Sequence, residues 1–272
     1  MDEFQDQENQ ASNQTEEEYE LNHTDKLVGV LTSPGSTFTE MSKFPPKTVD
    51  WVVPVLIMIV IAVVSNIVMM SNPMIKNTIL EKRMEMVEKS MQSAVDKGQI
   101  SQEKADEQLE KMRDRMESGA GNPLLTAISS TIVIFILFFI ISGIFYLFIK
   151  LGLKGEGTYG SAMVAYGLPY YILILQAIVV VILALTMNRP FRDTSVASFL
   201  SSDRLTLVGW FLAKLDIFSI WFFAVISIGF AKMFKSESTG KYFALVFGLW
   251  LGFSLLMYFA AHAVPFLRGF AM

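Results

Sequence analysis

The stretch LLTAISSTIVIFILFFIISGIFYLFI, residues 124–149, contains 26 residues and no charge. An α-helix rises 1.5 Å per residue, so this stretch would extend about 39 Å, which exceeds the ~30 Å hydrocarbon core of a bilayer. Shorter apolar runs are typical of the buried helices of soluble proteins. Residues 124–149 therefore predict a membrane-spanning helix and an integral membrane protein.

Further apolar stretches share this lack of charge: residues 51–71, 160–187 and 217–231, and the segment between Lys241 and Arg268. Trp51 begins the first of them, a position where tryptophan is typical of the membrane–water interface. We therefore expect an all-α integral membrane protein with five transmembrane helices, whose spans two to five occupy residues 124–267.

The fourth span is the shortest. Only 15 uncharged residues separate Asp216 from Lys232, and they would reach about 22 Å as a helix. The span is long enough if Asp216 and Lys214 lie at the headgroup level, with the lysine extending to water. We then expect residues 194–213 to lie along the membrane surface. The alternative is one long tilted helix from Leu205.

The distribution of charge sharpens this division. Hydrophobic residues make up 52% of the 272-residue chain and charged residues 18%, but 21 of the 26 acidic residues lie before residue 118. This contrast excludes a single soluble domain. The chain has no cysteine and two histidines, so the sequence predicts no thiolate site and no metal site. It shows no basic patch typical of nucleic-acid binding.

Two segments precede the first span. Residues 1–25 are polar and acidic, and we expect a disordered tail because they cannot bury enough apolar surface to offset the entropy of ordering. Residues 26–50 are amphipathic: a turn at Pro34 precedes Phe38, Met41 and Phe44, which recur every three residues on one face of a short helix. This helix is either an anchor on the membrane surface or a helix packed on the membrane domain.

Residues 74–117 form a second polar region, between the first two spans. Apolar residues recur every three or four positions on both sides of a loop at 96–101, which predicts an extramembrane helical hairpin. Its 9 basic and 10 acidic residues are typical of a solvated surface. Its methionines, Met84, Met86, Met91, Met112 and Met116, form either a groove for a partner or the seam of the hairpin itself.

Three motifs carry a resemblance to a known family. They are LVGVLTSPGSTFTEMSKFPP at 27–46, which contains Pro34 and Phe38, AYGLPYY at 165–171, which contains Tyr166 and Pro169, and KLDIFSIWFFAVISIGFAKMF at 214–234, which contains Asp216, Phe218, Trp221 and Gly229. In this order they resemble the prokaryotic branch of the YIP (Ypt/Rab-interacting protein) family. The resemblance covers roughly residues 27–71 and 124–267, so the hairpin and the acidic tail look like additions.

The resemblance implies an all-helical integral membrane protein of the cytoplasmic membrane, with a cytosolic N-terminus and its C-terminus on the other side. Eukaryotic members of the family bind small GTPases, but the N-terminal tail of this chain shares no motif that carries such binding. Basic residues support the same orientation, because seven lysines fall on the cytosolic side and four arginines on the other. The nine basic residues of the hairpin point the opposite way.

Polar residues inside the apolar stretches are the candidates for function, because burying them without a partner is costly. Asp216 has two interpretations. It either pairs with an arginine such as Arg204 or faces a cavity, or it stabilises the start of its own helix through the free N–H groups there. Tyr166 and Gln176 of the third span would line a pathway under the first interpretation.

No catalytic pattern or cofactor motif is present. We therefore expect a non-enzymatic membrane scaffold or organiser that acts through protein and lipid contacts. Its partners would be the lipid bilayer and another membrane or peripheral protein bound through residues 74–117, and the sequence leaves a homo-oligomer open. The alternative is a small transporter or channel subunit in which Asp216 and the third span line a pathway.

Overall fold

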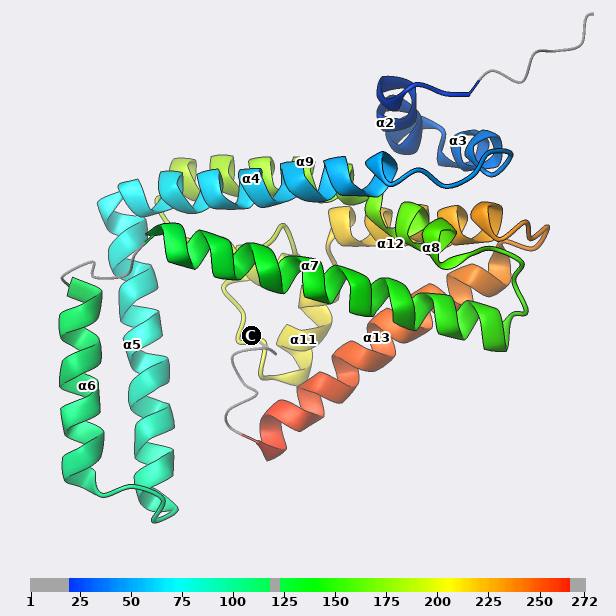
Figure 1. The fold of residues 1–272 in the computed structure, drawn as a ribbon. Coiled ribbons are helices and arrows are strands. Elements are labelled where there is room, and N and C mark those ends of the chain that lie inside the picture. The colour runs from blue at the N-terminus through cyan, green and yellow to red at the C-terminus, as the bar shows by residue number, and fades with distance from the viewer. Residues whose placement is uncertain (1–19, 118–122, 265–272) are drawn as a thin grey trace, which may run out of the picture.

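A computed structural model describes residues 20–117 and 123–264, apart from the side chains of 115–130. Every regular element in this part of the chain is a helix, as expected (Figure 1). The elements are α2 (His23–Thr32), α3 (Pro34–Met41), α4 (Val49–Ser71), α5 (Pro73–Asp96), α6 (Gln102–Glu117), α7 (Pro123–Leu147), the π-helix η1 (Phe148–Gly152), α8 (Tyr159–Gly167), α9 (Tyr170–Met187), α10 (Val196–Leu200), α11 (Leu207–Lys214), α12 (Ile217–Met233) and α13 (Gly240–Ala263).

The membrane-spanning elements agree with the apolar stretches of the sequence. Four helical segments are long and apolar enough to cross a bilayer: Val49–Ser71, Thr131–Gly152, Tyr159–Met187 and Gly240–Ala263. The pair α11 and α12 makes a fifth if it is taken as one span, and its two helices are bent by 61°. The protein is thus an all-helical membrane protein with four spans, or five with the bent pair.

The bend lies at Leu215 and Asp216. The backbone of Asp216 is extended (φ −132°, ψ 115°), so α11 cannot continue through it, and its side chain accepts a hydrogen bond from the Ser219 N–H to begin α12. One long helix from Leu205 is therefore wrong. The segment before α12 instead forms two short helices, α10 and α11.

The third span is broken as well, because α8 ends at Gly167 and α9 begins at Tyr170. Pro169 stands in the break, where the missing N–H of proline and its ring prevent a continuous helix. α9 packs against α4, while α8 packs against α7 and α12.

The two N-terminal helices pack on the membrane domain, α2 against α9 and α3 against α12 (Figure 1). Pro34 is the first residue of α3 rather than part of a turn, since proline needs no N–H at a helix start. Phe38 is fully buried, which favours the packed helix over the surface anchor. Residues 23–25, which we predicted to lie in the tail, are helical, and predicted tail residues 1–19 lie outside the described residues.

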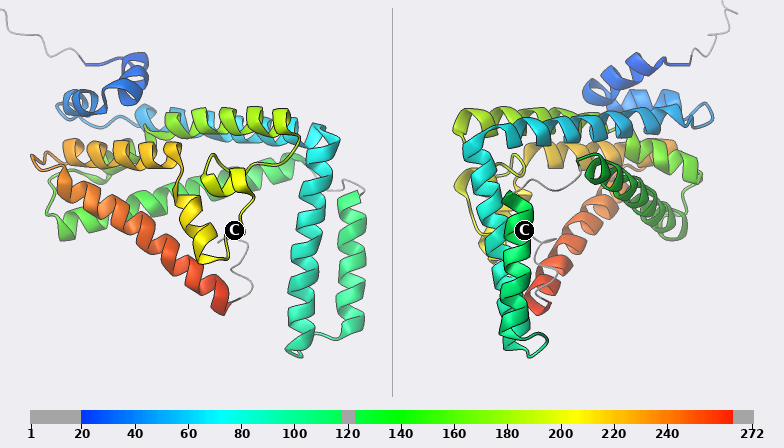
Figure 2. Two further views of the ribbon diagram at one scale, coloured as in Figure 1. Left: turned by 180° about the vertical axis from the view of Figure 1, so that it is seen from behind. Right: turned by 60° about the vertical axis from the view of Figure 1, so that its left-hand side comes forward.

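α5 and α6 run side by side in opposite directions and project away from the other helices (Figure 1 and Figure 2). Gly98 adopts the left-handed conformation (φ 67°) that ends many helices, as the loop at 96–101 predicts. Ala105 is buried between the pair, whereas Met86 is 41% exposed. Met86 therefore lies outside the seam in which we placed it, because it falls on the outer face of α5.

The base of α5 is fixed to the membrane domain. The Asn72 side chain accepts hydrogen bonds from the N–H groups of Met74 and Ile75, which starts α5 directly after α4. Ile75 is fully buried against Val180 and Ala184 near the end of α9. Only the part of the hairpin beyond this contact projects freely.

Candidate functional site

The predicted motif residues fall into three groups, and Phe38 belongs to the first. Its ring packs on Gly229 of α12, where an added Cβ would lie 3.0 Å from Phe38 Cζ and 3.2 Å from the carbonyl oxygen of Ala165. A glycine at 229 is thus what allows α3 to approach α12 and α8. Pro34 is the first residue of α3. Phe38 acts in packing.

Tyr166 belongs to the second group, a cluster of buried rings between α7, α8 and α12. Its ring centroid lies 5.5 Å from that of Phe138 and 6.1 Å from that of Phe222. Trp51, near the start of α4, stacks on Phe138 at 5.0 Å and is buried within the protein. Trp51 packs among apolar side chains of the core. Tyr166 is therefore part of the aromatic core.

Phe218 and Trp221, on the first turns of α12, are only partly buried at the edge of this core. Their ring centroids lie 6.3 Å apart. Neither of them touches the polar groups of Asp216 in a hydrogen bond or ion pair among the described residues. They lie at the periphery of the core.

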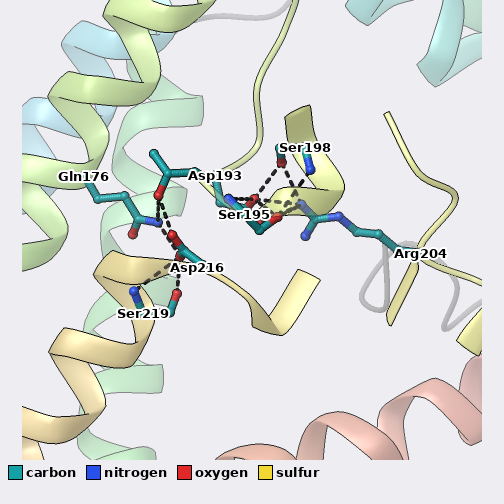
Figure 3. A network of polar contacts seen from close by, with 8 residues as sticks. Gln176, Asp193, Ser195, Ser198, Arg204, Asp216 and Ser219 are labelled. Atoms are coloured by element: carbon teal, nitrogen blue, oxygen red, sulfur yellow. Dashed lines mark hydrogen bonds and ion pairs between the residues drawn. The ribbon is translucent and has the colours of Figure 1, made fainter. Parts of the chain in front are cut away.

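Asp216 is at the centre of the third group (Figure 3). Its carboxylate is 1% exposed and accepts hydrogen bonds from the Gln176 amide (2.7 Å), the Ser219 N–H (3.3 Å) and the hydroxyl groups of Thr194 and Ser219. Four donors thus compensate for the loss of water at this buried carboxylate. The helix-start interpretation of Asp216 agrees with this geometry.

The depth of Asp216 follows from its contact with Gln176. Gln176 lies 11 residues before Met187, the last residue of α9. Eleven helical residues extend about 16 Å, so Asp216 lies beside the middle of the third span rather than at its end. The chain between α9 and α12 therefore folds back along the helices and brings a polar segment with it.

A second cluster adjoins this one, built around Asp193 (Figure 3). The hydroxyl groups of Ser195 and Ser198 each donate to Asp193 Oδ1 at 2.6 Å, and Arg204 Nη2 lies 2.8 Å from both carboxylate oxygens. Arg204, the arginine expected beside Asp216, thus pairs with Asp193 instead. Burial by itself would raise the pKa of Asp193, but these hydrogen bonds and the charge of Arg204 lower it.

A third cluster lies under α2 and escaped the sequence analysis. The Lys26 ammonium contacts both oxygens of Asp50, at 3.0 and 2.9 Å, and the two residues are 4% and 2% exposed. His23 Nε2 lies 2.7 Å from the Tyr171 hydroxyl oxygen, and His23 Nδ1 lies 3.7 Å from Asp50 Oδ1. This cluster fastens α2 to the first and third spans.

One signal in the sequence points to this pair. Asp50 is the last charged residue before the first span, and a carboxylate at such a position needs a cation or free N–H groups. Lys26 is the first basic residue of the chain and stands at the start of an apolar run. Glu20 extends the cluster because its carboxylate interacts with Lys26. It also accepts a hydrogen bond from Lys47 at 2.6 Å, and this bond lowers the pKa of its carboxyl group.

The acidic side chains of these clusters are paired within the chain. Within residues 20–117 and 123–264, no group of three His, Asp or Glu side chains could hold a metal ion. The buried carboxylates of Asp50, Asp193 and Asp216 are all occupied by cations or hydrogen-bond donors of the chain itself. What the geometry supports is stabilisation of broken and bent helices inside a membrane.

The comparison with protein families agrees with the order of the three motifs and with this helical architecture. The Yip1 domain matches residues 28–261. The chain belongs to the Yip1 family. The matched range encloses the α5–α6 hairpin, so it gives no support for treating the hairpin as an addition to the family. Searches among curated proteins and among solved structures found no match.

Proposed function

We propose that this Yip1-family protein is a non-enzymatic membrane scaffold, in which the α5–α6 hairpin binds another membrane or peripheral protein. The observation that carries the proposal is the placement of the hairpin. It is anchored through Ile75 to α9 and projects from the membrane domain with its charged faces exposed. A firmly based, solvated arm is suited to holding a partner at a membrane.

The internal polar clusters support a structural role for the rest of the chain. Their hydrogen bonds join α2 to α4, α2 to α9, and α9 to the start of α12, and these are the helices that a scaffold must hold in place. A homo-oligomer is compatible with this role and is a further outcome of the experiment below.

Transport is the second candidate, and one observation favours it: Asp216 is a buried carboxylate beside the middle of the third span. Against it, Asp216 is 1% exposed and its oxygens are occupied by Gln176, Thr194 and Ser219. A permeation pathway would require this carboxylate to release its donors. The scaffold therefore fits the geometry better.

We also propose that the N-terminal helices face the cytosol of a prokaryotic cell. The loops after η1 and after α12 meet at one end of the molecule, where the Glu156 N–H donates to the Phe234 carbonyl oxygen at 3.4 Å and Gly160 lies against Pro46. This end carries seven lysines: Lys43, Lys47, Lys150, Lys154, Lys232, Lys235 and Lys241. Short basic loops favour the cytosolic side.

The experiment is a pull-down of the intact protein in mild detergent after crosslinking in native membranes. A matched variant replaces residues 82–114 by a short Gly-Ser linker, which removes the arm and retains Ile75 at its base. The control K89Q/K111Q removes two exposed charges and retains the hairpin. The scaffold proposal expects a partner that the control retains and the shortened variant loses.

Recovery of the same partners by the shortened variant would count against the hairpin as the contact. Recovery of the chain itself as the only crosslinked partner would assign the hairpin to a homo-oligomer. Proton or cation uptake by vesicles containing the purified protein, lost in D216N, would favour transport over the scaffold.

A further inference from the structure

A groove of about 220 Å³ lies between α11 and α13, next to the Asp193 cluster. Its walls carry three cationic side chains, Arg192, Arg204 and Lys214, together with aromatic residues of both helices. No acidic side chain lines it. Of its three cations, only Arg204 also belongs to one of the internal clusters, through its ion pair with Asp193.

The positive charge in the groove is not balanced by the chain. Arg204 has a carboxylate partner in Asp193, at 2.8 Å. Arg192 and Lys214 form no ion pair in the described part of the chain, and Lys214 Nζ instead lies 5.8 Å from the ring centroids of Trp210 and Trp250. Partial burial lowers the pKa of Arg192, and repulsion from Arg204 lowers it further. Cations held together in this way favour an anion.

Aromatic side chains stand beside the cations of the groove. Trp210 and Tyr258, whose ring centroids lie 6.3 Å apart, stand between its two walls. Such rings combine an apolar body with a polar edge, so they can contact both the apolar and the polar parts of an amphiphile.

Large apolar side chains continue from the groove onto the exposed faces of both helices. Phe253, which lines the groove, is 67% exposed, and Leu256 and Phe211 are 61% and 55% exposed. A free inorganic anion would gain nothing from this rim. An amphiphile with a negative headgroup would place its charge among the cations and its chains along Phe253 and Leu256.

We propose that the groove between α11 and α13 binds the phosphate of an anionic phospholipid, with Arg192 and Lys214 as the cations that the lipid completes. Guanidinium groups match the oxygens of a phosphate in a two-pronged hydrogen bond, and lysine contributes a point charge. The bend at Leu215 and Asp216 turns α11 toward α13 and thereby forms the groove. This inference rests on the proposed function in one respect: it says where on the scaffold a lipid is bound.

The test compares dioleoyl phosphatidylglycerol with dioleoyl phosphatidylcholine, which share acyl chains and differ in net charge. Binding to the purified full-length protein is counted by native mass spectrometry after release from detergent. The wild-type protein should bind phosphatidylglycerol at least about tenfold more tightly than phosphatidylcholine, and R192Q/K214Q should lose most of this preference. Arg204 is left intact, because its removal would leave Asp193 without its partner.

Two further variants make the result specific. K235Q/K241Q removes the same charge from exposed positions at the lysine-rich end and should keep the preference. R192K/K214R keeps both charges and should therefore keep the preference for phosphatidylglycerol. Circular dichroism shows whether R192Q/K214Q folds, and R192K/K214R tests the proposal even if it does not. An equal loss in K235Q/K241Q, or no preference in the wild type, would overturn the proposal.

The last comparison uses inorganic phosphate as the ligand. If phosphate alone binds with the same dependence on Arg192 and Lys214, and phosphatidylglycerol binds no more tightly, the site takes a free anion and the lipid assignment is wrong. Because the readout is lipid binding, this proposal and the hairpin's protein contact can fail independently.

Discussion

Asp50 and Asp216 are both buried carboxylates beside apolar helices, but the chain compensates for them differently. Asp50 holds the ammonium of Lys26 and closes an ion pair across 24 positions of sequence. Asp216 is held by neutral donors from Gln176, Thr194 and Ser219, most of them close to it in the fold-back segment and α12. Asp50 is thus neutralised by an opposite charge, whereas Asp216 caps its own helix and accepts further hydrogen bonds from neighbouring side chains.

The difference teaches how much each site depends on its partner. Removing one member of a buried ion pair leaves the other as an uncompensated charge, whereas removing a carboxylate from neutral donors leaves dipoles. The N-terminal helices therefore depend mainly on one buried ion pair, with Glu20 as a second, partly exposed carboxylate 3.5 Å from the Lys26 ammonium. The bend between α11 and α12 depends on several weaker ones.

The largest effect is expected for D50N. The amide removes the carboxylate that contacts the buried Lys26 ammonium at 2.9 Å and leaves the partly exposed Glu20 at 3.5 Å, which should reduce the free energy of unfolding by about 3 kcal/mol. Thermal unfolding in detergent, followed by circular dichroism, measures the change. The control E40Q breaks an exposed ion pair with Lys43 and should change little.

Removing both charges sharpens this result. K26M/D50L replaces the pair by apolar side chains and should recover most of the stability that D50N loses. If D50N is no more harmful than E40Q, Lys26 finds another partner and the buried pair does not fasten α2.

A smaller loss is expected for D216A, about 2–3 kcal/mol, because it removes a helix cap and leaves the buried donors of Gln176 and Ser219 unsatisfied. D216N should lose less, since asparagine caps helices as well as aspartate does. The same unfolding assay ranks the two variants. Equal loss in both would show that the negative charge matters more than the cap, and the contrast with Asp50 would disappear.

The smallest effect is expected for E85Q. Glu85 contacts Lys89 at 2.6 Å on the outer face of α5, an ion pair of the same chemistry as Lys26–Asp50 but open to solvent. Water and salt screen it, so the unfolding temperature should stay within the error of the wild type. A loss comparable to that of D50N would mean that burial is not what separates the two pairs.

Sequence alone predicts those parts of the fold that depend on local pattern. Uncharged length indicates the long spans, and apolar periodicity with Gly98 indicates the hairpin. The helix-start interpretation of Asp216 agrees with the structure because a cap is made by residues three positions apart. Pro169 likewise marks the break in the third span.

The remaining features depend on contacts between distant residues. Lys26 and Asp50 meet only because α2 packs on the membrane domain, and a cation and a carboxylate in separate segments carry no pattern that pairs them. Trp51 stacks on Phe138, and no pattern in the sequence pairs these two rings. The cations of the α11–α13 groove come from a loop and a helix that meet only through the 61° bend.

Only Asn72 separates α4 from α5, and it caps the second helix as it ends the first. The connection between α4 and α5 is therefore short, and the contact of Ile75 with α9 fixes the direction of α5. The 24 residues of α5 give a lever about 36 Å long. A partner bound at the far end of α5 would therefore also change the orientation of α4, the first span.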